Sequence, residues 1–331
     1  LAGHDLPAVS EIARDLLLHR AGSLILAGPR QPAEVHALVH LMNFALGSAG
    51  LRVGYAAAPD PERPHHDAAI RELAAEIEAG EVDTLLLLGG NPAFDAPADL
   101  ELASRLAEVE TTIRLGLHED ETSRACDWHL PRAHYLESWG DARAWDGPLG
   151  VVQPLIEPLH GGRSAIELLA LLLGDEEVDG HSIVRRTFRD LHGEAGFEEG
   201  WRKTLHDGVL AGSGLPTEGR RALREVGWAD RAAAWLERPA AADGSLELVF
   251  LEDPAILDGR FANNGWLQEL PDPITKLTWD NALLLSPADA EARGLRQGDG
   301  VRLTRDERSV ELPVFILPGQ AEGTGAVHLG Y

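Results

Sequence analysis

Three groups of residues in this chain have types and spacings that could bind a ligand. The first is Gly89-Gly90-Asn91, followed by Pro92, directly after the apolar run Thr84–Leu88. Two glycines let backbone N–H groups approach a ligand closely, and the Asn91 amide can both donate and accept hydrogen bonds. In open α/β sheets, ligands bind at the carboxyl ends of the strands, which is where this turn would lie. A tight turn without a ligand explains the same residues equally well, and both interpretations stay open.

The second group lies in segment 121–131, with the sequence ETSRACDWHLP. An acidic side chain at the end of a strand suits a guanine edge or a ribose hydroxyl, so Glu121 and Asp127 are candidate binding residues. The alternative is a helix start, in which Asp120 or Thr122 accepts hydrogen bonds from the first free N–H groups. For Asp120 we favour this capping role.

The third group is Asn263-Asn264-Gly265-Trp266, in a polar loop with little periodicity. Asn263 and Asn264 can donate and accept hydrogen bonds in pairs, and the Trp266 indole can stack on a flat ring. The alternative is a loop that bonds to itself, with Trp266 as its buried plug.

The elements that would position these residues are predicted from hydrophobic periodicity. Residues 1 to 150 alternate strands with helices, which is typical of an α/β domain with a largely parallel sheet. The predicted strands lie at 23–27, 51–55, 84–88 and 111–115, and 84–88 is expected to be fully buried. The predicted helices lie at 32–46, 67–78 and 97–108.

The rest of the chain changes character twice. Residues 151–243 are predicted to be a helical connector, with helices at 164–173, 181–191, 197–210 and 220–237 and a linker at 239–244. Residues 244–331 are predicted to form a small β-barrel, entered by a strand at 246–251. In that block Ser286 would cap a short helix that ends at Gly294, and Val301 and Leu303 begin a period-2 pattern.

Composition excludes several classes of function. The formal net charge is −25, from 54 acidic and 29 basic residues, so the field of the chain would oppose binding to nucleic acid. The longest apolar run, 168–173, is far shorter than the roughly 20 residues of a membrane span. We expect the chain to be a segment of a longer protein.

The side chains that most often hold metals do not predict a metal site. The one cysteine, Cys126, excludes both a disulfide within the chain and an iron–sulfur cluster held by this chain alone, because a cluster needs about four thiolates. We expect Cys126 to be a small buried residue. His129 and His134 are not spaced as zinc ligands. Four aspartates lie in sequence contexts that favour turns, where their side chains would bond to the backbone: Asp253, Asp258, Asp272 and Asp280.

Segment 286–303, SPADAEARGLRQGDGVRL, resembles the start of the C-terminal dinucleotide-binding domain in the molybdopterin oxidoreductase superfamily. The matching residues are Ser286, Pro287, Asp289, Ala290, Gly294, Leu295, Gly298, Asp299, Val301 and Leu303. Segment 121–131 resembles a second motif of that superfamily, which continues to Glu137 and Gly140. It departs from the motif at Ser123 and Cys126, where the superfamily has alanine. The resemblance implies an α/β fold: a parallel-sheet Rossmann-like domain, a helical connector and a C-terminal double-psi β-barrel.

Within the superfamily, segments 153–174, 197–210 and 261–282 resemble the molybdopterin-like iron–sulfur subunit of alternative complex III, a quinol-oxidising membrane complex. This implies a scaffold without bound molybdenum that is not catalytic alone. The slot for the pterin would be filled by indoles, with Trp139, Trp145, Trp266 and Trp279 as candidates. The implied partners are an iron–sulfur, ferredoxin-like domain of the same parent chain, which carries the clusters, and other subunits of a respiratory electron-transfer complex. The implied location is the periplasmic face of a membrane.

Two other functions stay open at this point. One is a segment of a catalytic oxidoreductase that binds a bis-molybdopterin guanine dinucleotide cofactor. The resemblance places that cofactor at Gly89, Gly90, Asn91, Glu121, Thr122, Asp127, Asn263, Asn264 and Trp266. The other is a nucleotide-binding α/β module unrelated to pterins.

Overall fold

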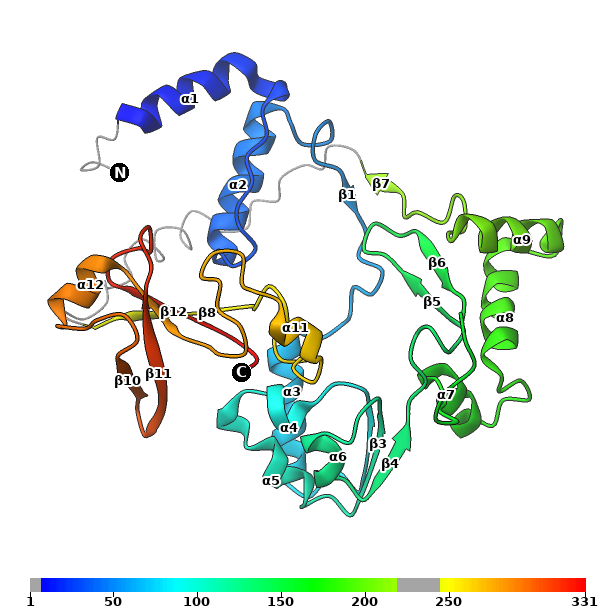
Figure 1. Cartoon of the computed structure of the whole chain (residues 1–331). Helices are drawn as coiled ribbons and strands as arrows, with labels where there is room; N and C mark the ends of the chain where they lie inside the picture. The colour runs from blue at the N-terminus through cyan, green and yellow to red at the C-terminus, as the bar shows by residue number, and fades with distance from the viewer. Residues whose placement is uncertain (1–6, 219–244) are drawn as a thin grey trace. The chain divides into compact units, whose positions relative to one another are not determined.

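The structure is a computed structural model that describes residues 7–218 and 245–331 (Figure 1). The chain forms two compact units, which are described separately below. The first unit takes in the described residues of Leu1–Arg63, Tyr135–Glu157 and Ala170–Pro239. The second unit takes in those of Pro64–His134, Pro158–Leu169 and Ala240–Tyr331. The domain boundaries expected at residues 150 and 243 stay a prediction.

A three-stranded parallel sheet lies in the second unit. Its order is β2 (Thr84–Leu88), β3 (Thr111–Gly116) and β4 (Trp128–Pro131). Its parallel strands, connected through helices, confirm the predicted α/β class. The expectation that β2 is fully buried is wrong, because β2 is an edge strand whose first and last residues are exposed.

Short helices connect these strands. Helix α3 (His66–Glu78) packs Ala74 against Leu100 and Leu102. The helix predicted at 97–108 is split into η2 (Ala98–Leu100) and α5 (Leu102–Leu106), because Glu101 has a left-handed backbone (φ 47°) that ends the first turn. Two further helices follow the strands β2 and β3: α4 (Pro92–Asp95) and α6 (Glu121–Ala125).

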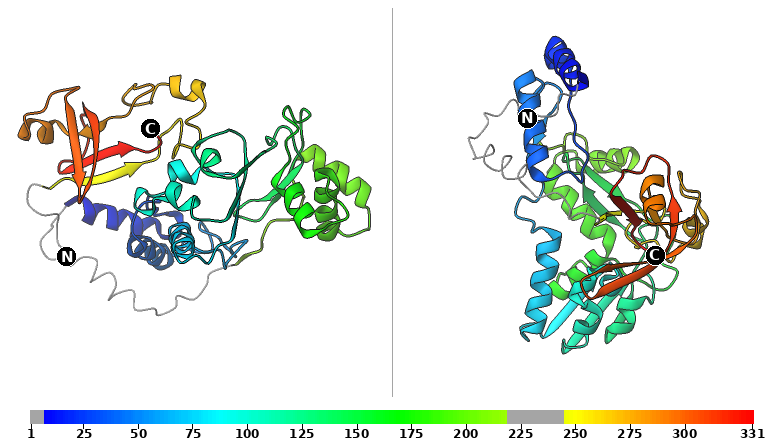
Figure 2. Two further views of the ribbon diagram at one scale, coloured as in Figure 1. Left: turned by 90° about the horizontal axis from the view of Figure 1, so that it is seen from below. Right: turned by 90° about the vertical axis from the view of Figure 1, so that its left-hand side faces the viewer.

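A separate mixed sheet also belongs to the second unit, in the order β10-β11-β9-β12-β8. Its strands are β8 (Glu247–Leu251), β9 (Leu283–Leu285), β10 (Gly300–Arg305), β11 (Arg308–Ile316) and β12 (Thr324–His328). Strands β8 and β12 run parallel side by side (Figure 2, left). The core consists of Leu283, Leu285, Val314 and Val327, and the side chains predicted to face inward, among them Val301, Leu303 and Leu312, pack against it. The double-psi topology stays a prediction.

Helix α12 (Pro287–Ala292) begins as the sequence predicted. The buried Ser286 Oγ accepts a hydrogen bond from the Asp289 N–H at 3.0 Å and donates one to Asp289 Oδ2 at 2.7 Å. The Gly323 N–H donates to the same carboxylate oxygen at 2.8 Å. One capping serine therefore also orients an acidic side chain that holds the turn before β12.

The first unit is mainly helical. It contains α1 (Pro7–His19), η1 (Arg20–Gly22), α2 (Ala33–Leu46), α8 (Gly180–His192) and α9 (Phe197–Asp207), with α7 (Ala165–Leu173) divided between the units. Its strands form two pairs: β1 (Tyr55–Ala56) with β7 (Thr217–Glu218), and β5 (Gly140–Arg143) with β6 (Leu149–Val152). The core between α8 and α9 is aromatic, with the rings of Phe188 and Trp201 5.2 Å apart.

Two strands predicted near the N-terminus are wrong. Residues 51–55 leave only Tyr55 in a strand, the short β1. Residues 23–27 form no strand, because a side chain replaces the neighbouring strand: the Ile25 N–H donates to Asn43 Oδ1 at 3.0 Å, and Asn43 Nδ2 donates to the Ile25 carbonyl at 2.8 Å. The helix predicted at 220–237 and the linker at 239–244 lie outside the described residues.

Replacing Ser286 by alanine tests the importance of the α12 cap. We expect Ser286→Ala to lower the free energy of unfolding by about 1–2 kcal/mol, because a cap is lost and a buried carboxylate loses a donor. Ser10→Ala, at an exposed serine of α1, is the control and should stay within about 0.5 kcal/mol of the wild type. Chemical denaturation measures both variants, and equal stabilities would contradict the assigned role.

Candidate functional site

The glycine turn after β2 lies at the carboxyl end of the parallel sheet. Gly89 and Gly90 have left-handed backbones (φ 87° and 70°), which other residues adopt only with strain. The Gly89 N–H donates to the Leu115 carbonyl at 2.9 Å, which joins the turn to β3. The space beside Gly89 is taken by the guanidinium of Arg132, which is the end of an exposed, flexible side chain and could move aside, so the left-handed backbone is what favours glycine here.

Asn91 connects this turn to helix α6. Its Nδ2 donates to Glu121 Oε2 at 2.8 Å, and its Oδ1 accepts from the Thr122 N–H at 3.1 Å and the Thr122 Oγ1 at 2.6 Å. Thr122 Oγ1 in turn accepts from the Ala93 N–H at 3.0 Å. The bond from Asn91 is the main cause that lowers the pKa of Glu121. The structure therefore brings Asn91 of the first predicted group together with Glu121 and Thr122 of the second, and their side chains bond to each other.

Gly89, Asn91, Glu121 and Thr122 form a corner at the carboxyl end of the sheet, and the charged side chain of Arg114 is buried beneath it. Arg114 is 2% exposed and donates to Asp120 Oδ2 at 2.5 Å, to Ser123 Oγ at 3.0 Å and to the Gly89 carbonyl at 3.3 Å. Asp120 also accepts from the Ser123 N–H at 3.0 Å, which confirms its predicted cap of α6. Sequence analysis missed Arg114, although a charged residue within the apolar run 111–115 was a signal for it.

Asp127 lies at the other end of the sheet. Its carboxylate accepts from the Thr112 N–H at 2.8 Å and from Thr112 Oγ1 at 2.9 Å, next to the first residue of β3. The Thr112 backbone bond is the largest of the causes that lower the pKa of Asp127. Leu115, by contrast, pairs with Leu88 at the end that bears the glycine turn. The structure therefore does not bring Asp127 to the corner formed by Gly89 and Asn91.

The third predicted group forms the start of α11 (Gly265–Glu269). Asn264 caps this helix, because its Oδ1 accepts from the N–H groups of Trp266 and Leu267 at 3.1 and 3.4 Å, while Asn263 is exposed. The indole of Trp266 is 85% exposed, so the expectation that it is a buried plug is wrong. A five-residue helix on a loop offers no core into which a large ring could pack.

The other three indoles proposed to fill the pterin slot differ in how far they are buried. In the first unit, Trp139 stacks on Trp201 with ring centroids 6.1 Å apart, while Trp145 is 70% exposed. In the second unit, Trp279 is 57% exposed. Within each unit as described, Trp139 alone of these four packs into a core, and that core belongs to α8 and α9.

The loop that carries Asn263 and Trp266 starts beside helix α4. A β-carbon added to Gly259 would lie 3.3 Å from Cδ1 of Phe94 and 3.1 Å from Cα of Gly330, so the three chain segments are in close contact. Phe94 is three residues beyond Asn91. The beginning of the loop and the glycine corner therefore lie on neighbouring parts of the second unit.

The four aspartates predicted to hold turns do so. Asp253, Asp258, Asp272 and Asp280 each accept a hydrogen bond from a backbone N–H one to three residues further along the chain. Among residues 7–218 and 245–331, no three His, Cys, Asp or Glu side chains gather as a metal site requires. Cys126 is free and half-buried rather than buried, and its burial is the main cause that raises its pKa.

Comparison with known proteins supports the fold. The chain is similar to acetylene hydratase from Pelobacter acetylenicus, a molybdopterin-containing enzyme, with a TM-score of 0.54 and 16% sequence identity. The match covers 79% of this chain but 39% of that enzyme. No family model and no curated protein matches the chain. The relationship that follows is one of fold alone.

Removing one partner of the buried ion pair between Arg114 and Asp120 tests whether this pair stabilises the corner. We expect Asp120→Ala to lower the free energy of unfolding by about 3–5 kcal/mol, because it leaves Arg114 buried without its counter-charge. The double variant Arg114→Met with Asp120→Ala removes both charges and should recover about half of that loss or more. If denaturation shows the double variant to be no more stable than the single one, the pair is not what holds this corner.

Because the charge of Asp258 acts on Asp95, we expect the effect of Asp95 on stability to depend on pH. Asp95 is exposed to solvent, but desolvation by the neighbouring protein, followed by the charge of Asp258, raises its pKa. The folded state thus holds this proton more tightly than the unfolded chain, and the ionised carboxylate opposes folding at neutral pH. We expect Asp95→Asn to raise the melting temperature at pH 7, with the gain disappearing once the pH falls below about 4.

Asp99→Asn is the matched control for that experiment. Its bond to Arg71 lowers the pKa of Asp99, so its ionised form favours folding, and neutralising it should lower the melting temperature at pH 7. Shifts of the same sign in the two variants would contradict the assignment.

Proposed function

We propose that this chain is the molybdopterin-oxidoreductase-like segment of a subunit in a quinol-oxidising complex of the alternative complex III type, and that it acts as a scaffold without bound molybdenum. One observation carries the proposal: Asn91, Glu121 and Thr122 bond to one another. A base or pterin at these side chains would have to break those bonds before it formed its own, and each is worth about 1 kcal/mol.

The remaining candidate side chains fit a pterin no better. Asn264 uses its oxygen as a helix cap, and Asp127 is bonded to Thr112 at the far end of the sheet. The polar side chains of this site therefore do not fit a pterin in the arrangement they adopt, which supports a structural role.

As a scaffold, the segment would join other parts of an electron-transfer complex. The proposed fold is a Rossmann-like domain, a helical connector and a double-psi β-barrel. The proposed partners are a ferredoxin-like iron–sulfur domain of the same parent chain and further subunits at the periplasmic face of a membrane. No helix within the described ranges is long and apolar enough to cross a bilayer.

A second candidate, a catalytic oxidoreductase that binds the pterin dinucleotide, is favoured by a different observation. The backbone N–H groups of Gly90 and Asn91 have no hydrogen-bond partner among the described residues, and neither does the exposed guanidinium of Arg132 beside Gly89. Two free amides and an arginine suit an anion such as a diphosphate. When bound, a molybdenum-pterin cofactor would supply the redox chemistry, which the side chains of this chain do not provide.

Metal and pterin analysis of the parent protein, purified from its native membranes, separates the two candidates. We expect far less than one molybdenum or tungsten per chain by mass spectrometry of the metals, and no fluorescent pterin after oxidative release. Stoichiometric metal with pterin would overturn the scaffold proposal and favour the catalytic one.

A thermal-shift experiment with GDP tests the free amides and Arg132 as a nucleotide site. A scaffold should show no rise in melting temperature, whereas a nucleotide that binds the folded state stabilises it by RT ln(1 + [L]/Kd). A rise that is lost in Arg132→Ala but kept in Arg302→Ala, an exposed arginine of β10, would favour a nucleotide-binding function.

A further inference from the structure

The loop between β8 and β9 turns large apolar side chains to solvent at helix α11. Trp266 and Leu270 lie four residues apart, on one face of the helix and its C-cap, and both are exposed. The ring of Trp279 lies against Gly265, the first residue of α11, because a β-carbon added to this glycine would be 3.7 Å from Cη2 of the indole. Trp279 is also exposed, so three large apolar side chains surround one short helix. We call Trp266, Leu270 and Trp279 the indole face.

Hydrogen bonds to the backbone hold the indole face in place. Asn264 caps α11, and the Trp279 N–H donates to the Gln268 carbonyl at 3.0 Å, which fixes the last part of the loop to the helix. Trp279 has a left-handed backbone (φ 61°), which is an uncommon conformation for a bulky residue. Residues in such conformations persist only where the surrounding structure holds them, and they are found most often at binding and active sites.

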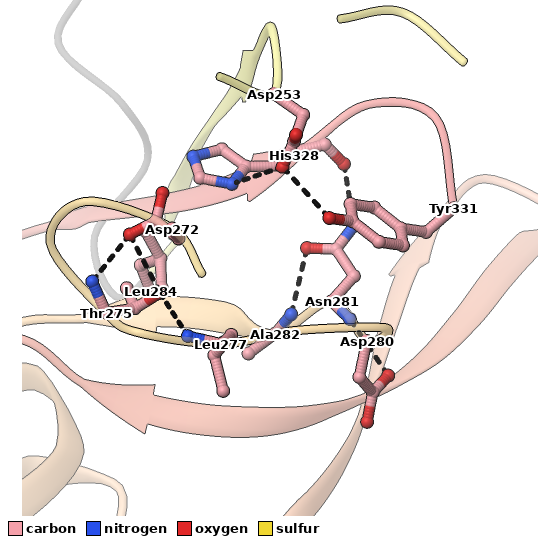
Figure 3. Close-up of a pocket in the computed structure, with 10 residues that line it drawn as sticks. All are labelled: Asp253, Asp272, Thr275, Leu277, Asp280, Asn281, Ala282, Leu284, His328 and Tyr331. Atoms are coloured by element: carbon pink, nitrogen blue, oxygen red, sulfur yellow. Dashed lines mark hydrogen bonds and ion pairs between the residues drawn. The ribbon is translucent and has the colours of Figure 1, made fainter. Parts of the chain in front are cut away.

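Polar side chains of the same loop bond within the protein instead. Asp272 accepts from the N–H groups of Ile274 and Thr275 at 2.8 and 2.5 Å. Asn281 donates to the His328 carbonyl at 2.7 Å, and with Asp272 it lines a cavity of about 10 Å³ (Figure 3). A loop that faces only water has the opposite arrangement, because burial favours apolar side chains and penalises polar ones. An ordered loop with its indoles outside is typical of a binding surface.

One acidic residue lies within the indole face. Glu269 is four residues beyond Gly265 and three beyond Trp266, so its side chain leaves the helix between Trp266 and the glycine that Trp279 covers. Glu269 is exposed, and its carboxylate has no hydrogen-bond or ion-pair partner among the described residues. A guanidinium can stack on an indole and pair with a carboxylate at the same time, because it is planar and charged. The arrangement therefore suits an arginine side chain.

The charges around the indole face distinguish between its possible occupants. Asp280 directly follows Trp279 and is exposed, so two carboxylates accompany the indoles. A second copy of the chain, related by a two-fold axis, would bring these carboxylates and their equivalents into one interface, which is unfavourable. An anionic membrane would be repelled by them and by the formal net charge of −25. A protein surface that presents arginine beside apolar side chains complements both the indoles and the carboxylates.

We propose that the indole face docks a protein surface outside residues 1–331, and that an arginine of this partner lies between Glu269 and the indoles of Trp266 and Trp279. Tryptophan and arginine are enriched among the residues that contribute most to binding at interfaces. The inference deepens the scaffold function proposed above and rests on it for the existence of a partner. The two can fail separately, because bound molybdenum would overturn the scaffold role and leave the outcome of the docking experiments unchanged.

Hydroxyl-radical footprinting of the intact parent complex tests whether the indole face is covered. The rate of oxidation, measured by mass spectrometry, reports the exposure of each indole. We expect Trp266 to be oxidised several-fold more slowly in the wild-type complex than in Glu269→Arg, which would repel the arginine of the partner. Trp145, an exposed indole of the first unit, is the internal control and should react equally in both. Equal oxidation of Trp266 in the two complexes would overturn the proposal.

Photo-crosslinking identifies the occupant. A benzophenone amino acid in place of Leu270 should form crosslinks, within the intact complex, to an arginine-containing peptide from outside residues 1–331. Crosslinks to lipid would show a membrane-binding surface, and crosslinks to residues 1–331 would show either a second copy or a contact within this chain. Each of these results would contradict the proposal, and so would the absence of any crosslink.

Matched variants separate docking from folding. Trp266→Ala and Glu269→Gln alter exposed side chains, so both should keep the melting temperature of the wild type. Each should weaken binding of the crosslinked partner by about tenfold, whereas Glu291→Gln, at an exposed glutamate of α12, should leave it unchanged. Reversing the crosslinked arginine to glutamate should restore binding to Glu269→Arg. If Trp266→Ala and Glu269→Gln both bind the partner as the wild type does, the indole face is not its docking surface.

Discussion

The carboxyl end of the parallel sheet depends on one buried charge, the guanidinium of Arg114. It is paired with Asp120, and it also reaches Ser123 and the Gly89 carbonyl. A single planar group thus joins β3, the cap of α6 and the glycine turn after β2. Because a buried guanidinium is costly unless all its neighbours are in place, this pair couples the geometry of three segments that are distant in sequence.

Asn91 completes the corner that Arg114 supports. Its hydrogen bonds connect the glycine turn to α6, so the corner is a structural contact between these segments and not an open binding site. Its amide donates to one side chain of α6 and accepts from the next, so both faces of the amide are used. What remains free are backbone N–H groups and an exposed arginine, which suit an anion and not a base or ring. Any ligand at this corner would be held mainly through its charge.

The mixed sheet presents a contrast. Its core strands are regular and apolar, but the segment between β8 and β9 is long, polar and strained at Leu257, Lys276 and Trp279. Polar bonds from Tyr331 and His328 reach Asp253 and Asn281 at its two ends, and within it Ile256 is fully buried, so the segment is held by both polar bonds and packing.

Much of the fold was predictable from sequence, because it depends on neighbours along the chain. Helix α12 follows from the Ser286 cap, α3 and α8 follow from apolar periodicity, and β2 and β3 follow from apolar runs beside turns. The same holds for the four turn aspartates, whose partners are one to three residues away. The α/β class follows from the alternation of strands and helices. Because the strands are parallel, the glycine turn and Glu121 both lie at the carboxyl end of the sheet.

The tertiary structure decided everything that depends on distant partners. Residues 23–27 have a strand-like sequence, but Asn43 occupies the hydrogen bonds that a neighbouring strand would have made. Asp127 fits a binding motif, yet its register opposite Thr112 places it at the wrong end of the sheet, and Trp266 is exposed because no core reaches it. Local sequence thus determined which elements form and where their caps lie. Only the three-dimensional arrangement determined which polar groups are already bonded to the protein, since hydrogen-bond partners far apart in the chain leave no periodic trace in it.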